Sequence, residues 1–501
     1  MTASLTPLPG KRACVIGAGL GGLALAIRLQ AAGVDTVLVE ARKTVGGCAW
    51  AVQKDGFTFD GGPTAWTDTA ALGALWSLTG HDMADDVELL PITPFYRLNW
   101  PDGVNFDVTG NEAAMAAEVA RIAPGDLEGY EDFLDYAASA YAEIFPRLDK
   151  GVARDIPSLL RSAPGFARLQ AWRSLHAMAA SRVRSDRLRE ALSVQAMVFG
   201  GNPFSTSAVY ALAHMLERNG GVWWPKGGSA ALAAAMARQF ERIGGTLRLH
   251  DPVLNIATIG NRAHEVETQS GWRERFDAVA SNADLVHSYR DLLGDTVRGP
   301  EMARKLVRKT YSPALFQVHF ALEGSWPGIQ HNTMLMGPRF KGLFEDIFEH
   351  GVLPADMLIH LHHPTVTDDT LAPPGKSVMR AMVPVANLGK LPIDWEAVGP
   401  LIEKRVLDEV GRRLIPDIHD RIITAFHYSP RDHALDFNAH AGAAFSLAPV
   451  RSQSALLRPP NRDARLRNFY LVGAGTHPGA GVPAVVASAR ATARLMLEDL
   501  K

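Results

Sequence analysis

The chain has 501 residues, and 51 Lys and Arg nearly balance 53 Asp and Glu. Hydrophobic residues make up 47% and charged residues 21%, as in an ordinary globular protein. The balanced charge argues against nucleic acid as a partner. The length exceeds what one hydrophobic core supports, so we expect about two to four structural units.

The cysteine content and the hydropathy indicate the cellular compartment in which the protein resides. The two cysteines, Cys14 and Cys48, allow at most one disulfide, which favours a reducing environment. The N-terminus lacks the basic start, apolar run and cleavage site of a signal peptide. No apolar stretch reaches the roughly 20 residues that cross a bilayer. We therefore expect a cytoplasmic protein that meets a membrane, if at all, only at its surface.

The N-terminal segment has the pattern of a nucleotide-binding strand–turn–helix. The apolar run 13–16 predicts a buried parallel strand, and a turn with Gly17, Gly19 and Gly22 follows. Gly17 permits the tight turn, Gly19 lets a pyrophosphate approach the backbone, and Gly22 lets helix and strand pack closely. The free N–H groups at the helix start attract phosphate.

The next elements complete this fingerprint. The helix is expected to end near Gly33, and a second strand at 37–39 leads to Glu40, 18 residues after Gly22. An acid at this position can accept hydrogen bonds from a ribose hydroxyl. The alternative, a glycine-rich turn without a ligand, does not account for the strand, helix and acid together.

Two further glycine turns favour FAD over NAD. Gly46 and Gly47 lie just beyond Glu40, and the segment 56–63 predicts a strand followed by another glycine turn. Taken singly, either glycine pair can be an ordinary β-turn. Their order supplies a backbone surface against which a flat isoalloxazine ring can lie.

The C-terminal segment 468–496 repeats the strand–glycine turn–helix pattern. A buried strand is expected at 469–472, a glycine-rich turn follows, and a helix begins near Pro483. The positive end of that helix suits the electron-rich edge of a reduced flavin; the alternative is a buried unit without a ligand. The two chain ends are therefore expected to meet in one domain. No second fingerprint for a nicotinamide nucleotide occurs between them.

The sequence resembles the bacterial phytoene desaturases, a branch of the flavin amine-oxidase-like superfamily. The resemblance extends over almost the whole chain, including the segments 15–33, 56–64, 87–98, 128–136, 169–174, 200–207, 221–228, 280–293, 461–463 and 468–489. It implies an FAD enzyme that inserts double bonds into a forty-carbon polyene, with phytoene as substrate and neurosporene or lycopene as product.

The resemblance also implies a set of cofactor-binding residues, with which we include Val253. The set is Gly17, Gly19, Gly22, Glu40, Arg42, Gly46, Gly47, Pro63, Val253, Gly475, Gly481 and Val482. Two positions depart from the family pattern. Relatives commonly have arginine where this chain has Cys48, which removes a cation near the flavin, and often have alanine at the position of Gly61.

The predicted fold class is α/β, with a Rossmann-like FAD-binding domain assembled from discontinuous segments and an inserted α+β substrate-binding domain. The FAD domain is expected from the segments 1–70, 222–290 and 460–501, in which a helix follows Gly228 and strands lie near 246–249, 253–256, 263–268 and 278–281. The substrate domain is expected from 71–221 and 291–459.

The segment 152–190 is the candidate for membrane contact. It carries eight arginines against three acidic residues, with apolar residues at roughly helical spacing. A basic amphipathic helix with Trp172 and Phe166 on its apolar face can lie in an anionic membrane surface. The alternative is an ordinary helix whose arginines are solvated or paired. A lipid-soluble polyene favours the membrane, specifically a peripheral position at the inner membrane.

The chemistry needs a hydride acceptor, which flavin supplies, and a dry pocket that positions the substrate. A polyene has no polar group to bind, so binding depends on buried apolar area, about 25 cal/mol per Å², and we expect a long apolar tunnel.

Candidates for a base are His319, His331, His360, His362, His363, Asp432 and His433. Each is more simply structural, so no catalytic residue is assigned. Metal binding by the 360–363 histidines is not expected, and 431–433 is expected to be a loop.

Alternative functions stay open at this point. Another flavin enzyme on the same fold, such as an amine oxidase, a later carotenoid desaturase or a polyene saturase, would keep all the glycine turns. A prenyl- or lipid-binding protein without activity would also keep the fold, and Cys48 fits that alternative weakly. A quinone or oxygen as electron acceptor fits the lack of a nicotinamide site.

Overall fold

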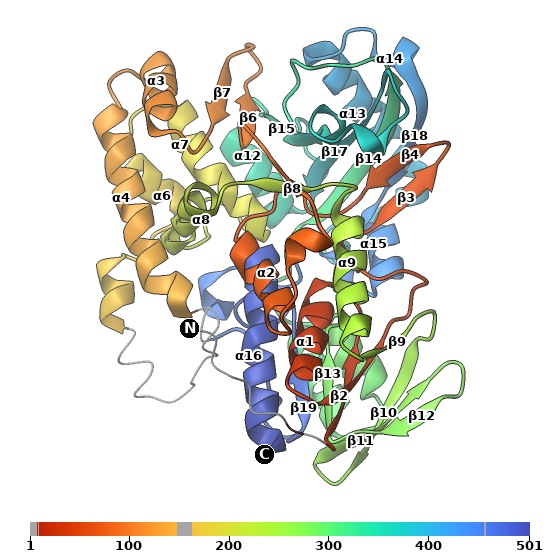
Figure 1. The fold of residues 1–501 in the computed structure, drawn as a ribbon. Helices are drawn as coiled ribbons and strands as arrows, with labels where there is room; N and C mark the ends of the chain where they lie inside the picture. Colours follow the sequence, from red (N-terminus) through yellow and green to blue (C-terminus); the bar gives the residue numbers. More distant parts are fainter. Residues whose placement is uncertain (1–7, 9, 148–162, 455–456) are drawn as a thin grey trace.

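The computed structural model describes residues 8, 10–147, 163–454 and 457–501. Two large sheets organise these residues, a five-stranded parallel sheet in the lower half of Figure 1 and a seven-stranded sheet in its upper right. Helices gather at the upper left, beside the seven-stranded sheet. No helix among the described residues is both long enough and apolar enough to cross a bilayer.

The parallel sheet draws its strands from three distant stretches of the chain. Its order is β19–β13–β1–β2–β9, with the bounds Phe469–Leu471, Ala278–Ser281, Arg12–Ile16, Asp35–Val39 and Thr246–Arg248. The central strand β1 is buried on both faces, because Ala13 and Val15 join one apolar cluster while Cys14 and Ile16 join another. The predicted Rossmann-like sheet from discontinuous segments is confirmed, and such two-sided burial explains the unbroken apolar run.

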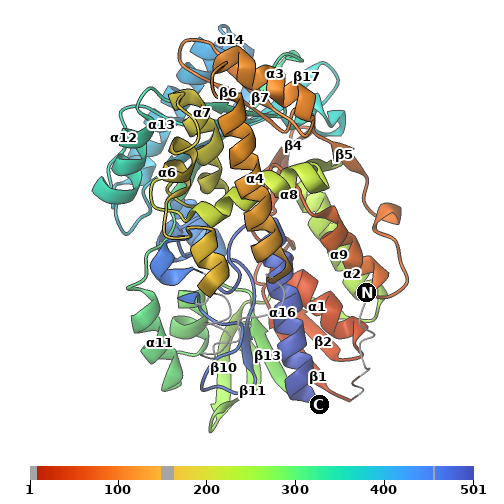
Figure 2. The same ribbon diagram turned by 90° about the vertical axis from the view of Figure 1, so that its left-hand side faces the viewer.

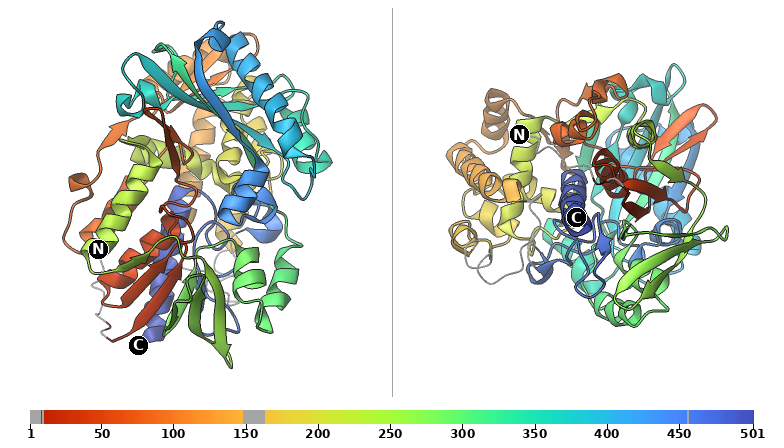
Figure 3. Two further views of the ribbon diagram at one scale, coloured as in Figure 1. Left: turned by 90° about the vertical axis from the view of Figure 1, so that its right-hand side faces the viewer. Right: turned by 60° about the horizontal axis from the view of Figure 1, so that its bottom comes forward.

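Helices cover one face of this sheet and a small sheet covers the other (Figures 1 and 3). The helices are α1 (Leu20–Ala31), α9 (Ser229–Arg242) and α16 (Val482–Leu500), and α1 packs against the other two. The small sheet is antiparallel, with β10 (Val253–Ile259), β11 (Arg262–Thr268) and β12 (Arg273–Arg275). Helix α1 ends at Ala31, and Ala32 is its C-cap. The next residue, Gly33, has φ of 79°, a conformation that is common just past the end of a helix.

The seven-stranded sheet has the order β18–β14–β17–β16–β15–β6–β7. The bounds in that order are Ile422–Tyr428, Ala314–Glu323, Lys376–Val385, Ile359–His362, Asn332–Leu335, Tyr96–Asn99 and Asn105–Val108. One face packs against α13 (Trp395–Arg413), since Phe316, Val318 and Val406 share an apolar cluster. The opposite face carries polar side chains and meets the hairpin of β3 (Ala51–Lys54) and β4 (Phe57–Asp60).

The remaining elements link these two sheets. A short antiparallel pair, β5 (Leu89–Pro91) with β8 (Trp223–Pro225), precedes α9. The helices at the left of Figure 1, which face the viewer in Figure 2, are α3 (Glu112–Ile122), α4 (Leu127–Ile144), α6 (Leu175–Ala180), α7 (Asp186–Ser193) and α8 (Leu212–Gly220). The others are α2 (Thr69–Ser77), α10 (Leu285–His287), α11 (Arg298–Leu306), α12 (Phe340–Glu345), α14 (Ile418–Arg421) and α15 (Pro430–Phe437).

Two sequence-based expectations were wrong. Residues 431–433 lie in α15, not in a loop, because Ser429 and Asp432 form a reciprocal capping box and Pro430 occupies the first turn. The described part of 152–190 is not one amphipathic helix, because short elements such as α6 and α7 are separated by turns. Leu169, Leu175 and Met178 are buried in the main core instead of forming a lipid-facing stripe. Residues 152–162 lie outside the described residues.

Candidate functional site

The turn between β1 and α1 disfavours any side chain larger than that of glycine at the three fingerprint positions. Gly17 has φ of 94°, a conformation that favours glycine. A Cβ on Gly22 would lie 1.9 Å from the carbonyl oxygen of Gly17, and one on Gly19 would lie 2.7 Å from Nδ2 of Asn282. Helix α1 has no side-chain cap and no acidic residue in its first turn. Its N-terminal backbone is therefore accessible to an anionic group.

Glu40 stands directly after β2, at the carboxyl edge of the parallel sheet. Its Oε2 accepts from the backbone N–H of Ala18 at 2.7 Å, and its Oε1 accepts from the N–H of Arg42 at 2.9 Å. Only 7% of Glu40 is exposed, and this burial raises the pKa of its carboxyl group. The carboxylate thus lies beside the glycine turn, as expected of an acid that binds a ribose.

Two other residues of the predicted set lie near Glu40. The backbone of Glu40 pairs with Arg248 and Asp251, which lead into β10 and so bring Val253 toward this edge. The Arg42 guanidinium lies 4.7 Å from the ring centroid of Phe437 in α15, a cation–π contact.

Gly46 and Gly47 lie against the first turn. The N–H of Gly46 donates to the carbonyl of Ala18 at 2.8 Å, and Gly46 forms an isolated bridge with Gly19. A Cβ on Gly47, whose φ is 56°, would lie 3.1 Å from Cα of Gly19. The second glycine pair therefore continues the side-chain-free surface that begins at α1.

The turn after β4 extends this surface further. The Asp60 carboxylate accepts from the N–H groups of Gly62 at 2.8 Å and Ser229 at 2.6 Å, and the Ser229 hydroxyl donates to the carbonyl of Pro63 at 2.8 Å. These bonds fix the turn to the start of α9. A Cβ on Gly61 would lie 2.1 Å from the Trp50 ring, so the departure at Gly61 accommodates this tryptophan.

The C-terminal glycine turn meets the N-terminal one, as the sequence predicted. A Cβ on Gly21 would lie 3.2 Å from Cα of Gly473 and 3.1 Å from Val485. Helix α16 begins at Val482 after Gly481, with no side-chain cap and no acid in its first turn. A Cβ on Gly475 would lie 3.1 Å from the Ser446 hydroxyl oxygen, which is buried without a partner among the described residues.

Sequence reasoning missed two residues that join these turns. Asn282 follows β13, and its side chain approaches Gly19, Gly21 and Gly473. Its position after a parallel strand, at the edge where α/β ligands bind, was the available signal. Arg458 is buried, and its Nη2 donates to the carbonyl of Ala474 at 2.6 Å while its Nε donates to that of Thr476 at 3.1 Å.

These residues fit a dinucleotide such as FAD. Two uncapped helix starts, α1 and α16, approach the same glycine-lined surface, and added Cβ atoms at Gly19, Gly22 and Gly46 would collide with neighbouring atoms. The surface runs from the Glu40 region past Gly47 toward the 61–63 turn. A bound flavin would supply hydride acceptance at this surface.

Burial lowers the pKa of all six candidate histidines. Burial lowers the pKa of His331 and His360 to about 3 and that of His363 and His433 to about 4. His362 and His331 are joined by a 3.2 Å contact between their Nε2 atoms. Burial also lowers the pKa of His319 and His362, and Asp432 accepts bonds from Ser429 as a helix cap.

Cys48 directly follows the Gly46–Gly47 turn and is an exposed residue. Its Sγ lies 3.7 Å from Nε2 of His433, a side chain held neutral by burial. This histidine therefore does not replace the positive charge that the family resemblance implies at position 48.

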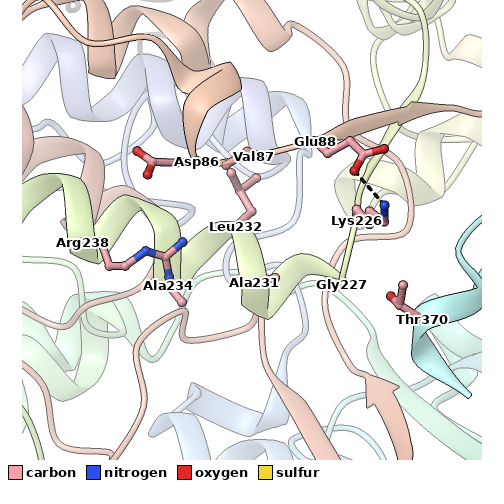
Figure 4. A pocket seen from close by; sticks show the side chains of 10 residues that line it. All are labelled: Asp86, Val87, Glu88, Lys226, Gly227, Ala231, Leu232, Ala234, Arg238 and Thr370. Atoms are coloured by element: carbon pink, nitrogen blue, oxygen red, sulfur yellow. Dashed lines mark hydrogen bonds and ion pairs between the residues drawn. The ribbon is translucent and has the colours of Figure 1, made fainter.

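A pocket of about 310 Å³ lies beside α9, outside the glycine-lined surface (Figure 4). Its lining includes Asp86, Glu88, Lys226 and Arg238, and Lys226 Nζ donates to Glu88 Oε2 at 2.8 Å. Such charged walls do not suit a hydrocarbon. The long apolar tunnel expected for a polyene stays a prediction.

Comparisons with known proteins agree with this geometry. The family described as "Flavin containing amine oxidoreductase" matches residues 20–497. Solved structures of putrescine oxidase bound to putrescine and of cyclohexylamine oxidase from Brevibacterium oxydans share the fold. Their TM-scores are 0.61 and 0.62, their identities 17% and 15%, and they cover 97% and 98% of this chain and 98% and 100% of their own.

Curated relatives are much more similar in sequence. A lycopene-forming phytoene desaturase from Paracoccus sp. is 48% identical over 98% of both chains. One from Pantoea ananas is 44% identical over 98% of this chain and 100% of its own. A neurosporene-forming one from Cereibacter sphaeroides is 40% identical over 97% of this chain and 94% of its own. The chain belongs to the flavin-containing amine oxidoreductase family, and within it to the bacterial phytoene desaturases, which are FAD-dependent oxidoreductases.

Proposed function

We propose that this protein dehydrogenates phytoene in carotenoid biosynthesis, with FAD as cofactor and neurosporene or lycopene as product. The observation that carries the proposal is the 48% identity to a lycopene-forming relative over 98% of both chains. Relatives with 44–48% identity form lycopene, and relatives with 38–40% identity form neurosporene. Identity therefore favours lycopene, the product of the larger number of steps.

The proposed cofactor contacts are the twelve predicted residues, and Asn282 joins them. Gly17, Gly19 and Gly22 leave room for the pyrophosphate at α1, and Glu40 accepts from the ribose. Gly475, Gly481 and Val482 place the α16 start at the electron-rich edge of the ring. We also propose the domain division predicted from the sequence, with an FAD domain from 1–70, 222–290 and 460–501 and a substrate domain from 71–221 and 291–459.

A reconstitution assay tests this function. Purified protein loaded with FAD, incubated with phytoene in lipid vesicles and a quinone, is expected to yield a coloured polyene that chromatography identifies. Oxygen replaces the quinone in a parallel reaction, which identifies the acceptor. Turnover of an amine but not of phytoene would refute the proposal.

The Gly19→Leu variant is the control for this assay and is expected to be inactive. The leucine Cβ would lie 2.7 Å from Asn282 Nδ2 and fill the approach to the backbone. We expect no bound FAD and at least a 1000-fold loss of turnover, about 4 kcal/mol. A yellow Gly19→Leu protein with stoichiometric flavin would contradict the cofactor assignment.

We further propose that the protein binds peripherally to the cytoplasmic face of the inner membrane through a surface around Trp172. Trp172 is 58% exposed. Arg451 donates to the carbonyl of Trp172, and the Arg168 side chain is 70% exposed. An exposed tryptophan beside an arginine suits an anionic bilayer.

Vesicle flotation tests this surface. Trp172→Glu is expected to lower binding to phosphatidylglycerol vesicles at least tenfold, because a charge replaces an aromatic anchor. Ile259→Glu serves as the control, since Ile259 is 64% exposed on the β10–β11 hairpin of the cofactor region. Equal loss in both variants, or none in Trp172→Glu, would refute the assigned surface.

A further inference from the structure

Arg380 is a nearly fully buried cation on the polar face of the seven-stranded sheet. It lies in β17, directly opposite His319 of β14, and is 2% exposed. Its Nη2 donates to the carbonyl of Gly62 at 2.6 Å, and its Nη1 approaches Oε1 of Gln317 at 3.4 Å. Its Nε is buried with no partner among the described residues. Burying a charged fork with an unused donor is costly unless it serves a ligand or a backbone.

The carbonyl that Arg380 holds belongs to the glycine-lined surface. A Cβ on Gly62 would lie 3.0 Å from Cα of Ala49, the residue after Cys48. Gly47 in turn lies against Gly19 at the start of α1. The glycine-rich backbone therefore runs from Gly19 past Gly47 to Gly62, and Arg380 contacts its Gly62 end.

The charge of Arg380 is retained at neutral pH. Burial lowers the pKa of Arg380 to about 10, against the opposing effect of the Asp60 carboxylate. The Asp60 oxygens accept from the N–H groups of Gly62 and Ser229, and no ion pair joins Asp60 to Arg380 among the described residues. The Arg380 and Asp60 charges nevertheless interact through the low-dielectric interior, where charge has a long reach.

We propose that Arg380 is a positioning residue for the flavin, holding the Gly62 turn and placing a positive charge beside the ring from the substrate-side sheet. Position 48, where the family resemblance implies arginine, is a cysteine in this chain, which supplies no positive charge. A fixed cation near the ring favours the reduced, more electron-rich flavin over the oxidised one. The inference rests on the proposed FAD binding and does not depend on the identity of the polyene.

The test separates charge from hydrogen bonding in the FAD-loaded protein. Arg380→Gln keeps a donor for Gly62 without the charge, and Arg380→Lys keeps the charge without the planar fork. The flavin midpoint potential is measured by reductive titration with reference dyes. Arg380→Gln is expected to weaken binding of reduced relative to oxidised FAD at least tenfold, about 30 mV for a two-electron couple, and Arg380→Lys to stay near the wild-type potential.

Lys376→Met is the matched control, since Lys376 begins the same strand and pairs at the surface with Glu323. Its potential is expected to be unchanged. Wild-type potential in Arg380→Gln, or equal shifts in Arg380→Gln and Arg380→Lys, would overturn the proposal. If Arg380→Gln does not fold beside the buried Asp60, Asp60→Asn/Arg380→Gln compared with Asp60→Asn alone gives the same contrast. Phytoene turnover is not needed for this readout, so a failure of the proposed function is detected separately.

Discussion

Gly22→Ala is expected to abolish FAD binding and to lower the free energy of unfolding by about 3 kcal/mol or more. The new Cβ would lie 1.9 Å from the carbonyl oxygen of Gly17 and 3.1 Å from its carbonyl carbon. Because both are backbone atoms, relief requires α1 to move away from β1. That movement would also displace the N–H groups at the start of α1. Flavin absorbance of the purified protein and urea unfolding measure the two effects.

Gly73→Ala is the matched control for this prediction. Gly73 lies inside α2, and a Cβ there would meet no atom within 4 Å. Alanine in a helix interior is expected to raise the free energy of unfolding by up to about 1 kcal/mol and leave FAD bound. A Gly22→Ala protein with full flavin content would refute the close helix–strand packing.

Arg458→Met is expected to lower the free energy of unfolding by about 3 kcal/mol and to release FAD. The guanidinium donates to the carbonyl oxygens of Ala474, Thr476 and Leu447, at 2.6, 3.1 and 3.2 Å. Methionine fills similar volume but leaves buried carbonyls without these donors, at about 1–3 kcal/mol each when unsatisfied. The C-terminal glycine turn would then lose the conformation in which it meets α1. Denaturant unfolding and FAD titration of the apoprotein report these changes.

Arg462→Met is the control because Arg462 pairs with Asp499 at the surface, where such pairs contribute about 0–1 kcal/mol. Arg458→Lys is expected to be intermediate, since one ammonium cannot match the fork that reaches three carbonyls. Equal stability of the Arg458→Met and Arg462→Met proteins would show that the buried bonds do not hold the turn.

Local sequence patterns located the N-terminal strands and the first helix well. The run 13–16, the Gly17–Gly22 spacing and the acid at Glu40 correspond to β1, the turn and the end of β2. These elements can be predicted from the sequence because the burial of a strand, the start of a helix and the type of a turn each depend on neighbouring residues. The capping box at Ser429 and Asp432 was equally local, and the expected loop at 431–433 overlooked it.

The segment 152–190 shows where periodicity was insufficient. Leu175 and Met178 have the spacing of an apolar helix face, and they are buried, but in the protein core. An apolar stripe reports that a face is covered and does not identify what covers it. Arginines of this segment pair with acids from elsewhere in the chain, such as Arg182 with Asp132 and Arg187 with Asp102.

The sequence by itself determined that both chain ends form strand–glycine turn–helix units, because those turns are short and their backbone requirements are local. Only the tertiary structure decided which distant side chains complete them. Asn282, Arg380 and Arg458 reach the turns across 265, 318 and 16 positions of sequence. Their roles depend on strand order and register, which long-range packing sets. For the same reason, the contact of Arg380 with the Gly62 turn is visible only once the two sheets are in place.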